Sequence, residues 1–175
     1  MRHPESAGME FSSVGALVLL HVLFATLWFG GAAYQVLVIG RTLMQAGPAA
    51  TGFALTLARR GGIGKYFAIN GALTILFGAA LYGQERIHEA PFVGRNLWLT
   101  LGAIVALLAF GHGLATNMPT ERKWLAVCRS VQGAPTPEQG QQMAMLGAKM
   151  GRLAVQSLAM LGVAILLMLM SRVLV

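Results

Sequence analysis

The sequence predicts an all-α integral membrane protein, a four-helix bundle with short amphipathic helices in its cytoplasmic loops. Of its 175 residues, 56% are hydrophobic and only 11% are charged, whereas a soluble domain carries about 25% charged residues. The apolar residues gather into four runs, each close to the roughly 20 residues that a helix needs to cross a bilayer. We expect these runs to form one transmembrane domain over residues 1–175, with spans at 13–39, 66–83, 96–116 and 153–174.

The first run, 13–39, is about twice as long as the apolar core of a signal peptide, which has about 7–15 residues. We therefore expect it to remain in the membrane as a helix. The segment that follows contains ATGFALTLARR at 50–60, which predicts an interfacial helix ending at the glycine pair 61–62. The second span, 66–83, is short and borrows residues from its flanks.

Two further helix starts follow the third span, 96–116. The motif Asn117-Met-Pro-Thr-Glu predicts a short amphipathic helix over 120–131. Thr136-Pro137-Glu138 combines an N-cap residue, a proline in the first turn and an acidic side chain near the helix N-terminus. A helix that begins there is expected to continue unbroken into the fourth span.

The basic residues predict how the chain is oriented. The loops at 40–65 and 117–152 hold nine Lys and Arg residues, and the opposite side of the membrane holds four. The positive-inside rule therefore places both loops in the cytoplasm and both termini outside it, for a multi-pass protein of the cell or inner membrane. The net charge of +7 does not indicate nucleic acid, because the basic residues lie between apolar runs and form no patch with interleaved aromatics.

Small and polar residues mark the helix faces that are expected to turn inward, since lipid does not drive helices together by hydrophobicity. One face of the first span carries residues spaced seven apart, namely His21, Trp28 and Gln35. One face of the second span carries residues spaced four apart, namely Asn70, Thr74, Gly78 and Tyr82. In the approach to the fourth span, Gly147 and Gly151 are expected to allow close helix packing.

Two histidines lie inside predicted spans, where a buried imidazole needs a partner or a role. His112 lies at the depth of Asn70 and Gln156, which predicts a hydrogen-bonded cluster, with cofactor binding as the alternative role. His21 lies in the outer half of the membrane. The helical rise separates the two histidines by about 12 Å along the membrane normal, so the pair is poorly placed to ligate a single iron.

No residue one turn from His21 offers a side-chain hydrogen bond. The small residues on the same face leave room beside the ring. We therefore expect His21 to ligate the iron of haem b, or to contact a porphyrin. The alternative is a hydrogen bond to Tyr82 or Thr100 across the helix interface.

The spacing of His21, Trp28-Phe29, Gly31 and Tyr34 (H-x6-W-F-x-G-x2-Y) resembles the first helix of the small bacterial protoporphyrinogen oxidases of the HemJ type. It also resembles the wider copper-resistance-protein-D-like superfamily of four-helix membrane proteins. In the oxidases the first-helix histidine is implicated in haem binding, so the resemblance implies that role for His21.

Trp98 and His112 form a looser second match to the same family. The family expects a lysine one helical turn after this tryptophan, and the chain has Gly102 there. This departure argues against the oxidase reaction itself.

The sequence thus predicts a haem- or porphyrin-binding membrane protein. Such a protein would be redox-active if the bound group contains iron. The expected cofactor-binding residues are His21, Trp28, Tyr34 and His112, with His21 as the metal ligand. Two alternatives stay open: an accessory subunit of a larger membrane complex, and a copper-handling protein suggested by ten methionines. A membrane redox partner and a homo-oligomer are both compatible with the small-residue faces. The chain has no Asp and no phosphate-binding loop, which argues against the chemistry of common soluble enzymes. The sequence leaves open whether the protein is an enzyme or a binding protein.

Overall fold

A computed structural model describes residues 12–60, 62–131 and 135–174, and all regular structure in these residues is helical. The prediction of an all-α bundle is confirmed. The α-helices, in chain order, are α1 (Ser13–Tyr34), α2 (Arg41–Ala46), α3 (Thr51–Arg60), α4 (Ile63–Gln84), α5 (Arg95–His112), α6 (Met118–Ser130) and α7 (Pro137–Val173). Short π- and 3-10 turns join them, namely η1 (Gln35–Gly40), η2 (Gly47–Ala50), η3 (Ile87–Glu89) and η4 (Gly113–Asn117).

The helix starts agree well with the sequence. Thr136 accepts a hydrogen bond from the Gln139 amide, and the Gln139 side chain bonds the Thr136 amide in return, which makes a complete capping box for α7. The helix then runs without a break to Val173, as predicted. The interfacial helix expected at 50–60 is α3. Gly62 follows it with a left-handed backbone (φ 57°) that an L side chain rarely adopts, and α4 begins at the next residue.

The helix predicted at 120–131 exists, but it is not separate from the third span. The π-turn η4 joins α5 directly to α6, so the helix is continuous from Arg95 to Ser130. Pro119 lies just beyond this turn and cannot donate a backbone hydrogen bond. A π-turn is a known way for a helix to absorb such an irregularity without stopping. The turn η1 joins α1 to α2 in the same way.

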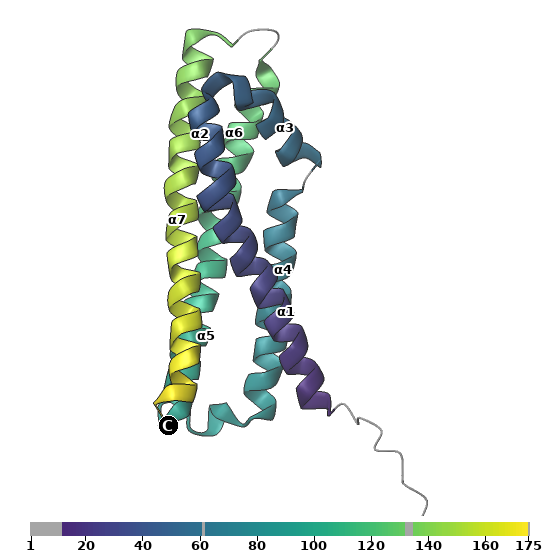
Figure 1. Cartoon of the computed structure of the whole chain (residues 1–175), viewed down its shortest axis with the longest axis vertical. Coiled ribbons are helices and arrows are strands. Elements are labelled where there is room, and N and C mark those ends of the chain that lie inside the picture. The colour runs from purple at the N-terminus through teal and green to yellow at the C-terminus, as the bar shows by residue number, and fades with distance from the viewer. Residues whose placement is uncertain (1–11, 61, 132–134, 175) are drawn as a thin grey trace, which may run out of the picture.

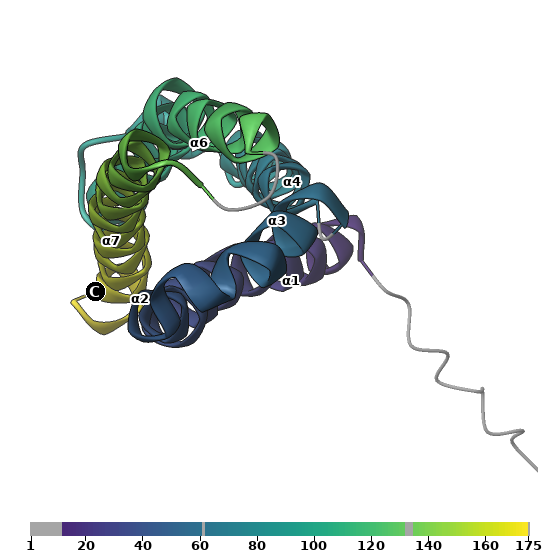
Figure 2. The ribbon, with the colours of Figure 1, turned by 90° about the horizontal axis from the view of Figure 1, so that it is seen from above.

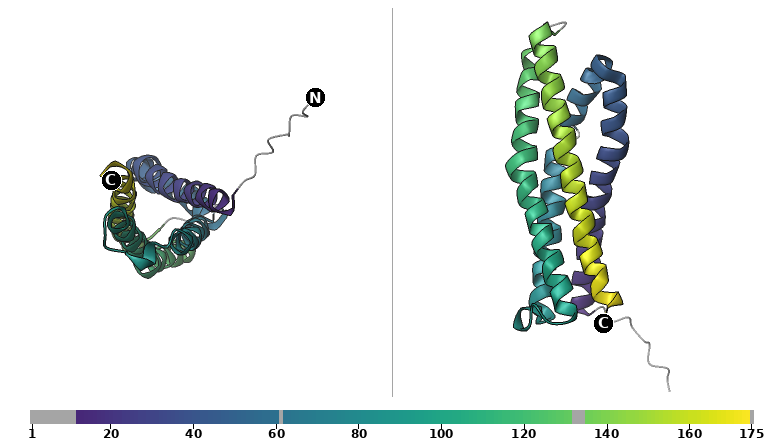
Figure 3. Two further views of the ribbon diagram at one scale, coloured as in Figure 1. Left: turned by 90° about the horizontal axis from the view of Figure 1, so that it is seen from below. Right: turned by 90° about the vertical axis from the view of Figure 1, so that its left-hand side faces the viewer.

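Within residues 12–60, 62–131 and 135–174, four helical stretches are long and apolar enough to cross a membrane, which is consistent with a multi-pass membrane protein. The stretch α4 has 22 residues, or about 33 Å, close to the ~30 Å hydrocarbon thickness. The others have 34, 36 and 37 residues, or about 51–56 Å. They overshoot α4 at one end of the molecule, where α2, α3 and α6 lie, while α1 begins and α7 ends at the opposite end (Figures 1 and 3).

The bundle consists of two tightly packed helix pairs, α1 with α4 and α5 with α7, which have fewer contacts with each other. Viewed along the bundle axis, α1 and α2 lie on one side, α7 on the second and α4 with α6 on the third (Figure 2). The pairs meet at a small apolar core of Trp28, Ala32, Ala109 and Leu161. Trp28 is 7% exposed and packs edge-on against Phe110, with 5.9 Å between the ring centroids.

Glycines set the closest approach within the α5/α7 pair. A Cβ atom at Gly102 would lie 2.7 Å from Cγ of Met168 and 3.1 Å from the backbone oxygen of Ala164. Gly102, the position at which the HemJ-type oxidases are expected to have a lysine, therefore lies directly against α7 and has no room for a side chain. In contrast, a Cβ at Gly147 or Gly151 would meet nothing within 4 Å. The expectation that these two glycines allow close packing is wrong.

Candidate functional sites

His21 is held by the backbone of α4. Its Nδ1 lies 2.9 Å from the carbonyl oxygen of Thr74, and since a carbonyl can only accept, Nδ1 carries the proton and donates. The ring reaches this carbonyl because Gly78 has no side chain: a Cβ there would lie 2.9 Å from Cε1 of His21. With Nδ1 protonated in the neutral ring, Nε2 keeps its lone pair. It makes no hydrogen bond within the described part of the chain.

The alternative prediction for His21, a hydrogen bond to Tyr82 or Thr100, is wrong. The Tyr82 hydroxyl and the Thr100 Oγ1 lie 2.9 Å apart and bond to each other. The predicted inward stripe on the second span does face the interior, since Asn70 and Thr74 are buried.

His112 belongs to a hydrogen-bonded cluster, as expected, but with different partners. Its Nδ1 lies 3.1 Å from the Ser157 hydroxyl oxygen, which also accepts a hydrogen bond from the Asn117 amide at 2.9 Å. The Asn70 amide instead donates to the Tyr66 carbonyl of its own helix, and Gln156 is exposed. His112 does not hydrogen-bond to Asn70 or Gln156, although the three were expected at the same depth. The reason is that α5 packs on α7 at this level, and Ser157 rather than Gln156 faces α5.

The four residues predicted to bind a cofactor do not form one site. His21 lies in the α1/α4 pair, His112 lies in the α5/α7 pair, and Trp28 lies in the core between the pairs. Tyr34 is 58% exposed on the outer surface. His21 therefore stands as a candidate site of its own, and Trp28 is a packing residue at the centre of the bundle.

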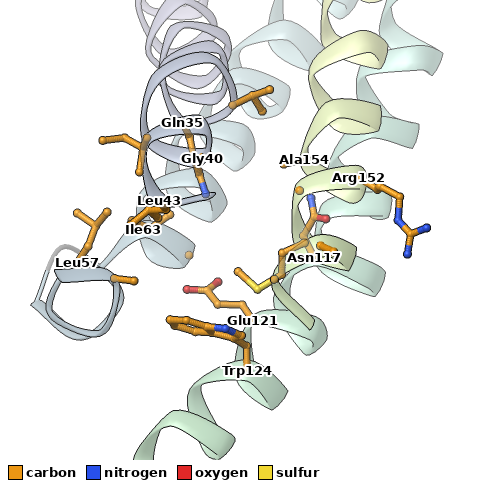
Figure 4. A pocket seen from close by; sticks show the side chains of 18 of the residues that line it. Gln35, Gly40, Leu43, Leu57, Ile63, Asn117, Glu121, Trp124, Arg152 and Ala154 are labelled. Carbon is orange, nitrogen blue, oxygen red and sulfur yellow. The ribbon is translucent and has the colours of Figure 1, made fainter. Parts of the chain in front are cut away.

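A large cavity of about 1550 Å³ occupies the end of the bundle where three helices overshoot α4. The core residues Trp28, Ala109 and Leu161 line its inner end. Residues of α2, α3, α6 and the first half of α7 form its walls, together with the start of α4. Figure 4 shows its polar part, where Asn117 at the end of η4 and Glu121 and Trp124 on α6 lie opposite Leu43 and Ile63.

Two oxygen-bearing side chains in this cavity are unusual for their surroundings. The Oδ1 atom of Asn117 is buried and has no hydrogen-bond partner within the described residues. Glu121 is partly buried, next to Gly64, where a Cβ would lie 3.1 Å from its Oε2. Across the described part of the chain its carboxylate makes neither a hydrogen bond nor an ion pair.

The sequence alone did not predict this cavity, although it contains two features that belong to it: the glycines of α7 and the acidic residue Glu121. Gly140, Gly147 and Gly151 all line the cavity and have open space where a Cβ would stand. By sequence, Glu121 is only one of the charges of a cytoplasmic loop. Its significance depends on α6 continuing from α5, which turns the residue toward the interior of the bundle.

In comparisons with known proteins, no family model, no curated protein and no solved structure matches this chain.

Proposed function

We propose that the protein is a haem- or porphyrin-binding integral membrane protein in which Nε2 of His21 is the metal-facing atom. One observation carries the proposal: Nδ1 of His21 donates to the Thr74 carbonyl and leaves Nε2 with a free lone pair. Histidines that bind metals typically donate their other ring N–H to a carbonyl or carboxylate, which fixes the tautomer and the ring orientation. The resemblance of the first span to the oxidase family supports the same residue.

The contacts of His21 support a metal held through a single protein imidazole. Gly78 lets the ring lie against α4, and Thr74 holds the ring in the tautomer that a metal requires. His112 is a poor second ligand, because its Nδ1 is bonded to Ser157 in the other helix pair. A bound haem would supply one-electron redox chemistry, while the chain would contribute the His21 imidazole as its ligand and a surrounding of low polarity.

The test is an absorption spectrum of detergent-purified protein expressed with ample haem, before and after reduction with dithionite. We expect a Soret band in the unaltered protein and its loss or shift in His21→Ala. His112→Ala is the matched control, since it also removes a half-buried imidazole. It should lower the melting temperature and keep the band. A protein without a Soret band, or a band unchanged in His21→Ala, would contradict the proposal.

We further propose that the overshooting end of the bundle faces the cytoplasm in a cell or inner membrane, with both termini on the other side. The nine basic residues of the two loops at that end support this orientation, against four elsewhere. A phosphatase reporter fused at the C terminus should be active in the periplasm, and one fused at Arg59 inactive. The reverse pattern would overturn the orientation.

A further inference from the structure

We propose that the cavity at the overshooting end of the bundle binds a hydrophobic organic cation, with the Glu121 carboxylate as its counter-ion. This site is separate from His21, which does not line the cavity, and it does not depend on a bound haem. The occupant is a monovalent cation whose charge is attached to a bulky apolar body.

The Glu121 carboxylate carries the charge argument. It is partly buried at the level where α4 begins and forms no ion pair within the described residues, although the adjacent Arg122 attracts it electrostatically. Removing a carboxylate from water without a partner is unfavourable, and an opposite charge within a few ångströms offsets that cost. Arg152 also borders the cavity, but its side chain is exposed and points away from Glu121 in Figure 4.

Two neighbouring side chains, Asn117 at the end of η4 and Trp124 on α6, also favour a cation. The buried Oδ1 of Asn117 is an acceptor that still needs a donor. Trp124 lies three residues after Glu121 on the same helix and borders the cavity, and the two side chains lie next to each other in Figure 4. The face of an indole ring attracts cations electrostatically. A carboxylate, an unpaired amide oxygen and an indole ring together select positive charge and disfavour an anion.

The rest of the cavity selects the apolar body. Its volume of about 1550 Å³ exceeds the ~300–1,000 Å³ of typical small-molecule pockets. Most of the remaining lining is aliphatic, aromatic or methionine. The glycines of α7 at positions 140, 147 and 151 leave this space open. A small hydrated cation would leave the apolar wall unused, whereas a lipophilic cation matches both parts.

The test compares two probes of the same shape and opposite charge, tetraphenylphosphonium and tetraphenylborate. Binding of each is measured by equilibrium dialysis against the full-length protein in nanodiscs of neutral lipid, with empty nanodiscs subtracted. We expect saturable, stoichiometric binding of the phosphonium and none of the borate. Glu121→Gln should weaken phosphonium binding by at least about tenfold, because the charge partner is lost while the side-chain shape is kept.

Two further variants make the result specific. Glu138→Gln is the matched control, since it removes the same charge from an exposed residue at the start of α7. It should bind the phosphonium as the unaltered protein does. Gly147→Leu should abolish binding by filling the cavity, and it should fold because no atom lies within 4 Å of the new Cβ. Equal binding of both probes, binding unaffected by Glu121→Gln, or no phosphonium binding at all would overturn the proposal. The Soret measurement above is independent of each of these outcomes.

Discussion

Gly102→Leu is expected to disrupt the α5/α7 pair and to cause a large loss of thermal stability. Its Cβ would lie 2.7 Å from Met168 and 3.1 Å from the Ala164 carbonyl oxygen, and the carbonyl cannot move without displacing the helix backbone. Overpacking of this kind costs about 1–3 kcal/mol or more. The intrinsic helix preference of leucine over glycine acts in the opposite direction and is smaller. The melting temperature in detergent, followed by circular dichroism, measures the effect.

Gly111→Leu is the matched control for this prediction. Gly111 lies on the same helix and is exposed, and a Cβ added there would meet no atom within 4 Å. The same substitution there should leave the melting temperature unchanged or raise it slightly. If both variants melt alike, the close approach of α5 and α7 at Gly102 is not the contact that holds the pair together.

Trp28→Ala is the second substitution with a large expected effect. Trp28 is the largest side chain of the core, packs edge-on against Phe110 and covers Gly71, where a Cβ would lie 3.1 Å from its Cε2. Truncating a buried tryptophan to alanine typically costs about 3–5 kcal/mol. We expect a strongly lowered melting temperature, with Trp28→Phe retaining much of the stability because it keeps an aromatic ring in the core.

This variant also separates a packing role from a cofactor role. If Trp28 were chiefly a contact of a porphyrin, Trp28→Ala would change the absorption spectrum and leave the melting temperature of the cofactor-free protein nearly intact. The structure assigns it to the core between the helix pairs, so the loss should appear in the cofactor-free protein.

The parts of the fold that sequence predicted well depend on local patterns. The four apolar runs, the helix start at Thr136-Pro137-Glu138 and the glycine break after α3 each depend on a few consecutive residues. The union of α5 with α6 is different, because Asn117 and Pro119 have the composition of a new helix start. Only the backbone path through η4 shows that the chain continues as one helix.

The candidate sites were predicted only in part, because the hydrogen-bond partners and packing neighbours of their residues lie on other helices. For His21 the alternative to a cofactor was a side-chain partner, but its Nδ1 donates to a backbone carbonyl, and every residue of α4 has one. Gly78 is the residue that makes this carbonyl reachable. Similarly, glycine permits close packing at Gly102 and open space at Gly147, and the difference depends on what lies opposite. Side-chain patterns within one helix do not contain that information.

The two π-turns have a consequence for the rotational phase of their helices. Each lies where a bilayer-length segment passes into its extension, and each contributes residues to the cavity, including Gln35 from η1 and Asn117 from η4. A π-turn adds one residue to a helical turn, which rotates all later side chains by about 100° relative to the earlier ones. A single helix can thus turn one face to its neighbour within the membrane and a different face to the cavity beyond it. The direction in which Glu121 points therefore depends on the turn that ends four residues before it, and not only on the residues around it.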